Sequence, residues 1–363
     1  MKLGIVGLPN VGKTCLFNAM TGQKADTSNY LFGTVGSNIG MVSVPDTRLD
    51  WLADHYQPKK KTPATIDFVD IAGLVRGASK GEGLGNKFLS NIRQVDALVH
   101  VVRCFDDENV AHADGSVDPA RDIETINLEL ILSDMDIVER RRDRAVKNSK
   151  GDKKYLAEAD LCQRLLDHLE LGQSARSFEF TDDEAELIKT SELLTLLPVI
   201  YVANLGEDAV SDPESSEYYK IVKDAAEAEG APCLPICALF EADIVELEEE
   251  DRQMFLEDMG ITETGLDKLI RASYALMGLI SFLTAGTDEC RAWTIRKGSK
   301  APKAAGKIHS DLERGFIRAE TVAFEDLKEA GNLNAAKTKG LLRSEGKEYV
   351  VQDGDVINIL FNV

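Results

Sequence analysis

Residues 7–14 form a G-x-x-x-x-G-K-[ST] segment, whose residue types suit the binding of a polyphosphate. Gly7 and Gly12 allow the backbone to curl so that successive N–H groups point at one centre. Lys13 can reach the β- and γ-phosphates of a nucleoside triphosphate, and the Thr14 hydroxyl can ligate Mg²⁺. We therefore predict that nucleotide is bound by Asn10, Val11, Gly12, Lys13, Thr14 and Cys15.

The elements on either side of this segment are those that such a loop requires. Residues 2–6 are apolar and predict a short strand, and residues 15–20 predict an amphipathic helix. A strand, a glycine loop and a helix in this order place the positive end of the helix at the bound phosphates. A simple glycine turn before a helix would need neither the lysine nor the threonine.

A second acidic motif follows about sixty residues later. Residues 65–70 alternate in polarity and predict a strand that ends at Asp70, which opens a D-x-x-G sequence ending at Gly73. In nucleotide switches of this class the Asp holds Mg²⁺ through water and the Gly N–H senses the γ-phosphate. The polar stretch 23–34 should supply a threonine that closes over Mg²⁺, either Thr34, which we prefer, or Thr27.

The residue after Gly73 is Leu74, where Ras-type GTPases place a glutamine that orients the attacking water. A leucine cannot orient water, so hydrolysis must be slow or must use another group. Residues 97–103 predict a buried strand, in which His100 is best interpreted as a core residue. His112 lies in a polar loop just beyond this strand, where ligands of open α/β sheets bind, so it could reach the nucleotide.

The predicted strand 197–203 runs into Asn204, Leu205 and Glu207, where a guanine-specific site would read N-K-x-D. The Asp of that pattern accepts hydrogen bonds from guanine, and Glu207 is one methylene too long for this geometry. Adenine lacks those donors, so we expect adenine to be accepted and preferred. A last strand, predicted over 232–239, should place Cys237 and Ala238 beside the base.

Within 128–145 and 155–169, mostly apolar residues recur at spacings of three and four. This pattern predicts an antiparallel helical hairpin with a coiled-coil seam. Leu128, Ile131, Met135 and Val138 open the first half of that seam. The tip is basic, and both a solvated surface and a contact with a phosphate backbone fit it. The basic residues are Arg140, Arg141, Arg142, Arg144, Lys147, Lys150, Lys153 and Lys154.

The net charge of −20 over 363 residues argues against a protein that coats free nucleic acid. Residues 291–347 nevertheless carry 13 Lys+Arg and 7 Asp+Glu, which makes a basic C-terminal module. No signal peptide or membrane helix is expected, and the six scattered cysteines fit reduced thiols in a cytoplasmic protein. The acidic stretch 241–258 predicts one solvated helix, and residues 266–279 an amphipathic one.

Taken together, the motifs at 7–14, 70–86 and 204–207 resemble those of the YchF/Obg-like ATPase family, and the resemblance spans essentially the whole chain. It implies an α/β fold: a P-loop NTPase domain, an inserted antiparallel coiled-coil arm, and a small C-terminal α+β (TGS, ubiquitin-like) domain. The expected boundaries are 1–125 with 195–278 for the nucleotide domain, 126–194 for the arm and 279–363 for the C-terminal domain.

The resemblance also implies a Mg²⁺-dependent NTPase that prefers ATP to GTP and binds ribosomes. It implies that Thr14 and Thr34 bind Mg²⁺, that Asn204 and Leu205 contact adenine, and that His112 replaces the missing glutamine. The segment around Thr34 departs from the family pattern, because Leu31 and Ser37 stand where the family has prolines. The sequence therefore supports Thr14 as a Mg²⁺ ligand more strongly than it supports Thr34.

Two other functions stay open at this point. The chain could be a ribosome- or protein-binding adaptor in which hydrolysis is incidental, or a conventional GTPase. K⁺ bound through Asn10 is a further candidate cofactor. We expect a monomer, with no DNA or membrane partner.

Overall fold

A computed structural model describes residues 1–22, 38–73 and 84–362, and for residues 84–87 and 249 the backbone only. The chain divides into two compact units. The first unit comprises Met1–Met41 and Asp67–Leu269, and the second comprises Val42–Ile66 and Ile270–Val363. In the part of the chain that the structure describes, no helix is both long and apolar enough to cross a bilayer.

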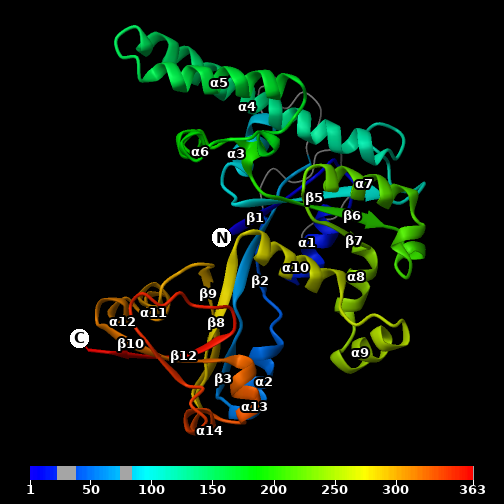
Figure 1. The fold of residues 1–363 in the computed structure, drawn as a ribbon. Helices are drawn as coiled ribbons and strands as arrows, with labels where there is room; N and C mark the ends of the chain where they lie inside the picture. Colours follow the sequence, from blue (N-terminus) through cyan, green and yellow to red (C-terminus); the bar gives the residue numbers. More distant parts are fainter. Residues whose placement is uncertain (23–37, 74–83, 363) are drawn as a thin grey trace. The chain divides into compact units, whose positions relative to one another are not determined.

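The first unit contains a six-stranded sheet, its covering helices and a helical arm (Figure 1). The strands of its sheet are β1 (Lys2–Val6), β2 (Asn38–Ser43), β4 (Thr65–Asp70), β5 (Ala97–Cys104), β6 (Val199–Leu205) and β7 (Cys233–Ile236). The helices are α1 (Lys13–Thr21), α3 (Leu84–Ile92), α4 (Pro119–Ser149), α5 (Tyr155–Glu170), α6 (Asp182–Lys189), α7 (Glu217–Ala228), α8 (Ala238–Glu246), α9 (Glu249–Asp258) and α10 (Gly265–Leu276), the last running into the second unit. Short 3₁₀ turns are η1 (Ala175–Ser177), η2 (Leu194–Leu196), η3 (Glu207–Ala209) and η4 (Pro213–Ser215).

The sheet has the order β2-β4-β1-β5-β6-β7, and its strands from β4 to β7 are parallel. Every residue of β5 is buried, because helices cover both faces of such a sheet. The register sets Ile5 opposite Asp70 and Val6 opposite His100. The loops that follow β1, β4, β5, β6 and β7 therefore meet at one edge, which is where open α/β sheets bind ligands.

Sequence reasoning placed these strands well and two neighbouring segments less well. The last strand ends at Ile236, because Ala238 already begins α8 and Cys237 stands at its N-cap. The acidic stretch 241–258 is not one helix. It is divided between α8 and α9, which are separated at Leu247 and Glu248 in extended conformation.

The arm is formed by α4 and α5, which pack along each other as an antiparallel pair (Figure 1). Its core includes Val138, Leu165 and Leu169 and is completed by Ile188 of α6. Leu128, which the helical pattern placed in the seam, is 51% exposed. The reason is that α4 begins at Pro119, and its first part packs on β5 and α7 instead of α5.

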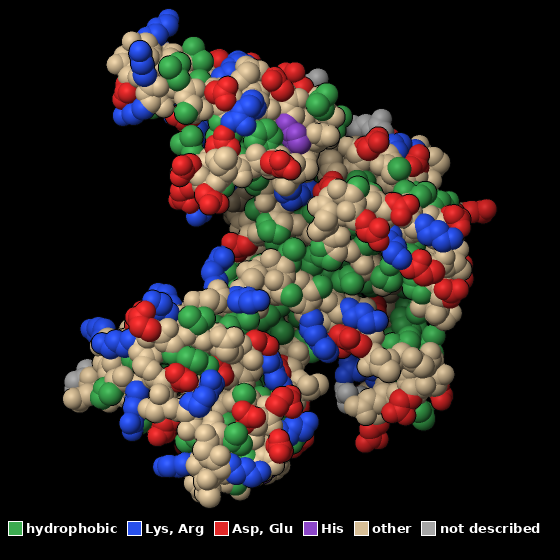
Figure 2. Space-filling model, in the orientation of Figure 1, with side chains coloured by type: hydrophobic (Ala, Val, Ile, Leu, Met, Phe, Trp, Pro, Cys, Tyr) green, Lys and Arg blue, Asp and Glu red, His purple; other side chains and the backbone are tan. Residues whose placement is uncertain are grey.

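The free end of the arm carries Lys and Arg side chains (Figure 2). Some of the predicted basic residues serve the arm itself: Arg141 pairs with Glu158 and donates to Ser191, and Arg142 pairs with Glu139. The basic surface is therefore narrower than predicted. Arg140 donates to the Asp136 carbonyl oxygen, and Lys154 pairs with Asp152. Among the described contacts, the exposed basic side chains with no partner are Arg144, Lys147, Lys150 and Lys153.

The second unit is an α+β structure, as predicted for the C-terminal part of the chain. Its strands are β3 (Lys60–Thr62), β8 (Leu279–Thr284), β9 (Glu289–Arg296), β10 (Phe316–Ala323), β11 (Arg343–Glu345) and β12 (Asp355–Phe361). They form a mixed sheet in the order β11-β10-β12-β8-β9-β3. The helices are α2 (Thr47–Tyr56), α11 (Ala301–Ile308), α12 (Ser310–Arg314), α13 (Phe324–Ala330) and α14 (Leu333–Thr338).

Residues 42–66 belong to this second unit, although the predicted boundaries placed them in the nucleotide domain. The cause is pairing between segments far apart in sequence. β3 runs parallel to β9, and the Thr62 hydroxyl donates to Glu289 at 2.6 Å. Arg48 of α2 also forms an ion pair with Asp353. No local sequence pattern predicts these contacts, because they join residues far apart in the chain.

Candidate functional site

The loop between β1 and α1 has the backbone that phosphate binding requires. Gly7 and Gly12 have φ angles of 153° and 96°, and Asn10 has a φ of 60°, all conformations that most side chains avoid. A Cβ at Gly7 would lie 2.4 Å from the Val101 carbonyl oxygen, and one at Gly12 would lie 2.2 Å from the Asn204 amide nitrogen. Both glycines are therefore required by conformation and by space.

Lys13 is the buried cation of this loop. Its Nζ donates to the Leu8 carbonyl oxygen at 2.6 Å. Burial lowers the pKa of Lys13 to about 8, and the nearby Asp70 carboxylate opposes this shift. An incoming phosphate would supply the negative charge that such a buried ammonium lacks.

Thr14 and Asp70 bring two oxygen ligands together. The Thr14 Oγ1 donates to Asp70 Oδ2 at 3.0 Å, because α1 begins beside the carboxyl end of β4. Burial raises the pKa of Asp70, while Lys13 and Thr14 lower it. Hydroxyl and carboxylate oxygens are the ligands that Mg²⁺ prefers, so this pair fits the ion.

The described residues hold no cluster of three or more His, Cys, Asp or Glu side chains able to bind a metal by themselves. A Cβ at Gly73 would lie 2.9 Å from the Pro9 backbone nitrogen and 3.2 Å from Lys13 Nζ, so the D-x-x-G motif lies directly against the phosphate loop. Thr34 and Leu74 lie outside the described residues.

Asn204 joins three segments of the site. Its Nδ2 donates to the Val11 carbonyl oxygen at 2.8 Å, and its Oδ1 accepts from the Ala238 backbone N–H at 2.9 Å. The Cys15 thiol donates to the Ala238 carbonyl oxygen at 3.3 Å. The sequence predicted Asn204 only as a contact to the base. Its side chain also fixes the phosphate loop to the start of α8.

The other predicted base-site residues lie at the same edge of the sheet. Leu205 is buried at the end of β6, and Glu207 is exposed at the start of η3. Cys237 is buried beside Ala238, and burial raises the pKa of the Cys15 and Cys237 thiols. The structure thus brings Asn204, Cys237 and Ala238 next to the phosphate loop.

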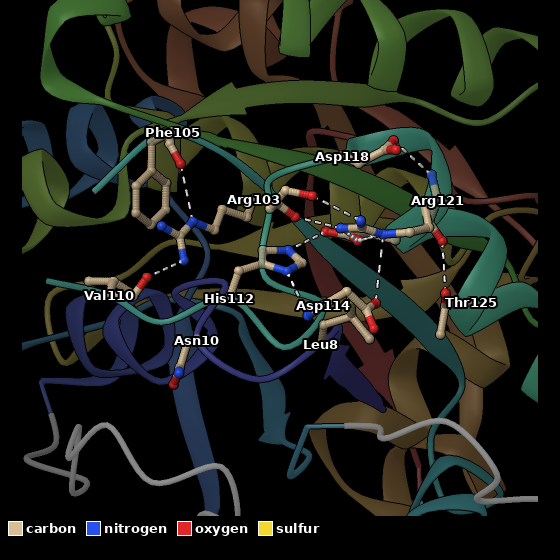
Figure 3. Close-up of polar contacts among 12 residues, drawn as sticks. Leu8, Asn10, Arg103, Phe105, Val110, His112, Asp114, Asp118, Arg121 and Thr125 are labelled. Atoms are coloured by element: carbon tan, nitrogen blue, oxygen red, sulfur yellow. Dashed lines mark hydrogen bonds and ion pairs between the residues drawn. The ribbon is translucent and has the colours of Figure 1, made fainter. Parts of the chain in front are cut away.

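The loop that follows β5 is built around Arg103, a residue that sequence reasoning missed (Figure 3). Its guanidinium is buried and donates to the carbonyl oxygens of Phe105, Asp107 and Val110. A buried cation must have its donors satisfied, and here they shape the loop. The signal was an arginine at the end of an otherwise apolar strand.

His112 lies in this loop, as predicted, but its ring is not free. Nε2 lies 2.9 Å from Asp122 Oδ2, and Nδ1 accepts from the Asp114 backbone N–H at 3.0 Å (Figure 3). The preceding residue, Ala111, accepts a hydrogen bond from Asn10 of the phosphate loop at 3.0 Å. His100, in contrast, is a core residue: it is buried against Tyr201, and burial lowers its pKa to about 3.

Comparison with known families matches two parts of the chain. Residues 2–138 match the family described as "50S ribosome-binding GTPase". Residues 279–362 match the YchF-GTPase_C family, described as "Protein of unknown function (DUF933)".

Two curated relatives and one solved structure illustrate matches over nearly the full length. The chain is 56% identical to the "Ribosome-binding ATPase YchF" of Bacillus subtilis (strain 168), covering 100% of both proteins. It is 49% identical to the protein of that name from Escherichia coli O157:H7, covering 100% of this chain and 99% of the relative. The Schizosaccharomyces pombe YchF GTPase structure superposes with a TM-score of 0.86 at 37% identity, over 99% of this chain and 97% of the other.

Proposed function

This chain belongs to the YchF family, and from that premise we propose that it is a Mg²⁺-dependent ATPase that prefers ATP to GTP and acts as a ribosome-associated nucleotide switch in the cytoplasm. The observation that carries the ATP preference is the end of β6. There Leu205 is buried and Glu207 is exposed, so these two described positions do not provide the Lys and Asp that read guanine. The names of the relatives support binding to the ribosome.

In this proposal the phosphates are bound by the backbone N–H groups of the phosphate loop and by Lys13. Thr14 would hold Mg²⁺ directly and Asp70 would hold it through water, with Thr34 as a further ligand. The ion supplies positive charge that neutralises the phosphate oxygens. Gly73 would place its N–H at the γ-phosphate, and His112 would position or deprotonate the attacking water. Because His112 is held by hydrogen bonds, slow basal turnover is expected.

The test is a calorimetric titration of nucleotide-free protein with Mg-ATP and Mg-GTP. We expect tighter binding of ATP. The matched variant Leu205→Lys with Glu207→Asp restores the guanine-reading pattern, and we expect it to shift the ATP/GTP ratio toward GTP by about tenfold, or ~1.4 kcal/mol. Tighter GTP binding by the unaltered protein would instead make it a conventional GTPase.

A second candidate function is a ribosome-binding adaptor in which nucleotide acts as a conformational ligand. The bonded His112 ring favours it, since that arrangement does not serve hydrolysis. This alternative predicts that Lys13→Ala protein still binds ribosomes at low salt. A role for K⁺ through Asn10 belongs to the ATPase proposal, and unchanged turnover on replacing potassium by sodium would exclude it.

A further inference from the structure

The His112 side chain is enclosed by the start of the arm helix α4. The side chains of His112 and Asp122 are only 5% and 3% exposed. The backbone N–H of Asp114 can only donate, so Nδ1 of His112 accepts and carries no proton. Nε2 therefore carries the proton and donates a hydrogen bond to Asp122 Oδ2.

With both ring nitrogens bonded, His112 has no lone pair to offer a water molecule. A group that orients or deprotonates water must lie within hydrogen-bond reach of it with an acceptor free. The ring must leave this arrangement, or lose at least the bond to Asp114, before it can act. In the described conformation the His112 ring is therefore fixed by two hydrogen bonds and cannot act on water.

Asp122 is itself fixed on the other side. Its Oδ1 accepts two hydrogen bonds from the Arg121 guanidinium, at 3.0 and 3.2 Å, and that guanidinium also bonds Ser116 (Figure 3). Asp118 caps α4 through the Arg121 backbone N–H at 3.1 Å. The carboxylate that holds His112 is thus set by the first turn of the helix that continues into the arm.

We infer that Asp122 is a positioning residue that keeps His112 out of the reaction until the loop between β5 and α4 opens. This inference rests on the proposed role of His112 in hydrolysis. The hydrogen bond from Asn10 to Ala111 links the phosphate loop to the loop between β5 and α4. Nucleotide contacts that turn Asn10 away would break this bond and make the β5–α4 loop easier to open. Movement of α4 by a partner on the arm would act on Asp122 directly.

The experiment measures steady-state ATPase rates of the full-length chain with Asp122→Ala, His112→Ala and both changes together. We expect Asp122→Ala to raise kcat about tenfold with KM unchanged. The change removes one of the two bonds that hold the ring, so the ring leaves the remaining Asp114 bond more often, while the nucleotide contacts are kept. The double variant should be as slow as His112→Ala, since the gain requires the ring. Asp122→Asn keeps an acceptor oxygen for Nε2–H and should fall between the unaltered protein and Asp122→Ala.

The matched control is Glu108→Ala. It removes an exposed carboxylate from the same loop that bonds neither His112, Asp122 nor Arg121, so we expect a rate close to that of the unaltered protein. If Asp122→Ala is as slow as His112→Ala, Asp122 orients an active ring and the inference is wrong. An unchanged rate in Asp122→Ala also overturns it.

The ¹⁵N shifts of the His112 ring separate this inference from the proposed function. The unaltered protein should show the Nε2–H tautomer with a hydrogen bond at Nε2, and Asp122→Ala should lose that signature. If His112→Ala hydrolyses ATP at the normal rate, the proposed role of His112 has failed. The spectrum then still shows whether Asp122 holds the ring, and an identical spectrum in Asp122→Ala would rule that out.

Discussion

At the scale of single residues, the site is dominated by charged groups whose burial has a function. Lys13 lies in the phosphate loop with a pKa of about 8, since burial disfavours its charged form. A bound polyphosphate favours the charged form strongly. Nucleotide binding and protonation of Lys13 are therefore linked.

This linkage predicts a specific pH dependence. Well below pH 8 Lys13 is already protonated in the free protein, so binding takes up almost no proton there. Above pH 8 binding must take up as much as one proton, and the association constant for Mg-ATP should fall by up to about tenfold per pH unit. Calorimetric titration between pH 7 and 9.5, in buffers of different ionisation enthalpy, measures both effects. Constant affinity without proton uptake would mean that the pKa of free Lys13 is not lowered.

Which of these contacts could be predicted depended on whether a recognisable sequence motif places the two groups together, and not on how far apart they lie in the chain. The phosphate loop and Asp70 were predictable because their spacing follows from one strand-loop-helix unit and one neighbouring strand. The bond between His112 and Asp122 was not, although they are ten residues apart, because it depends on the path that Arg103 imposes on the loop. The hydrogen bonds by which Asn204 links the phosphate loop to α8 could not be predicted either, because they depend on the register of β6 and β7.

At the scale of elements, α4 shows how one helix can have two environments. Its start packs on β5 and α7, and its remainder packs on α5. The helical period in the sequence showed that a helix was present but not where its partner changes. The signals for its true start, a capping Asp118 followed by Pro119, were present in the sequence.

The arm core gives a prediction about stability. Leu165 is fully buried in that core, so Leu165→Ala should lower the free energy of unfolding of the arm by about 2–5 kcal/mol. Leu128→Ala, the matched change at an exposed position of α4, should change it by less than about 0.5 kcal/mol. Urea unfolding followed by far-UV circular dichroism measures both. Similar losses in the two variants would contradict the described packing of α4.

At the scale of the whole molecule, charge is distributed unevenly on a chain with a net charge of −20. The free end of the arm and the C-terminal unit both expose Lys and Arg, and each could contact a ribosome through its phosphates. The arm end concentrates its basic residues within one turn and the helix ends beside it. We therefore expect it to make the larger contribution.

Replacing Arg144, Lys147, Lys150 and Lys153 by Gln should weaken ribosome binding and reduce its salt dependence. Four lost phosphate contacts would lower the slope of log K against log[salt] by about 3. The matched control replaces four exposed residues of the C-terminal unit: Arg296, Lys297, Lys337 and Lys339. Co-sedimentation with ribosomes over a salt series measures both slopes. A larger loss in the control would assign the main contact to the C-terminal unit.

The link that Asn204 makes between the phosphate loop and α8 has a consequence for how such a site can evolve. Its amide holds the phosphate loop and the start of α8, whereas Leu205 and Glu207 take no part in those bonds. In the proposed site, substitutions at 205 and 207 would change the base preference while the Asn204 bond to the phosphate loop stays intact. A lineage would then be able to exchange one nucleotide for another in steps that each keep phosphate binding.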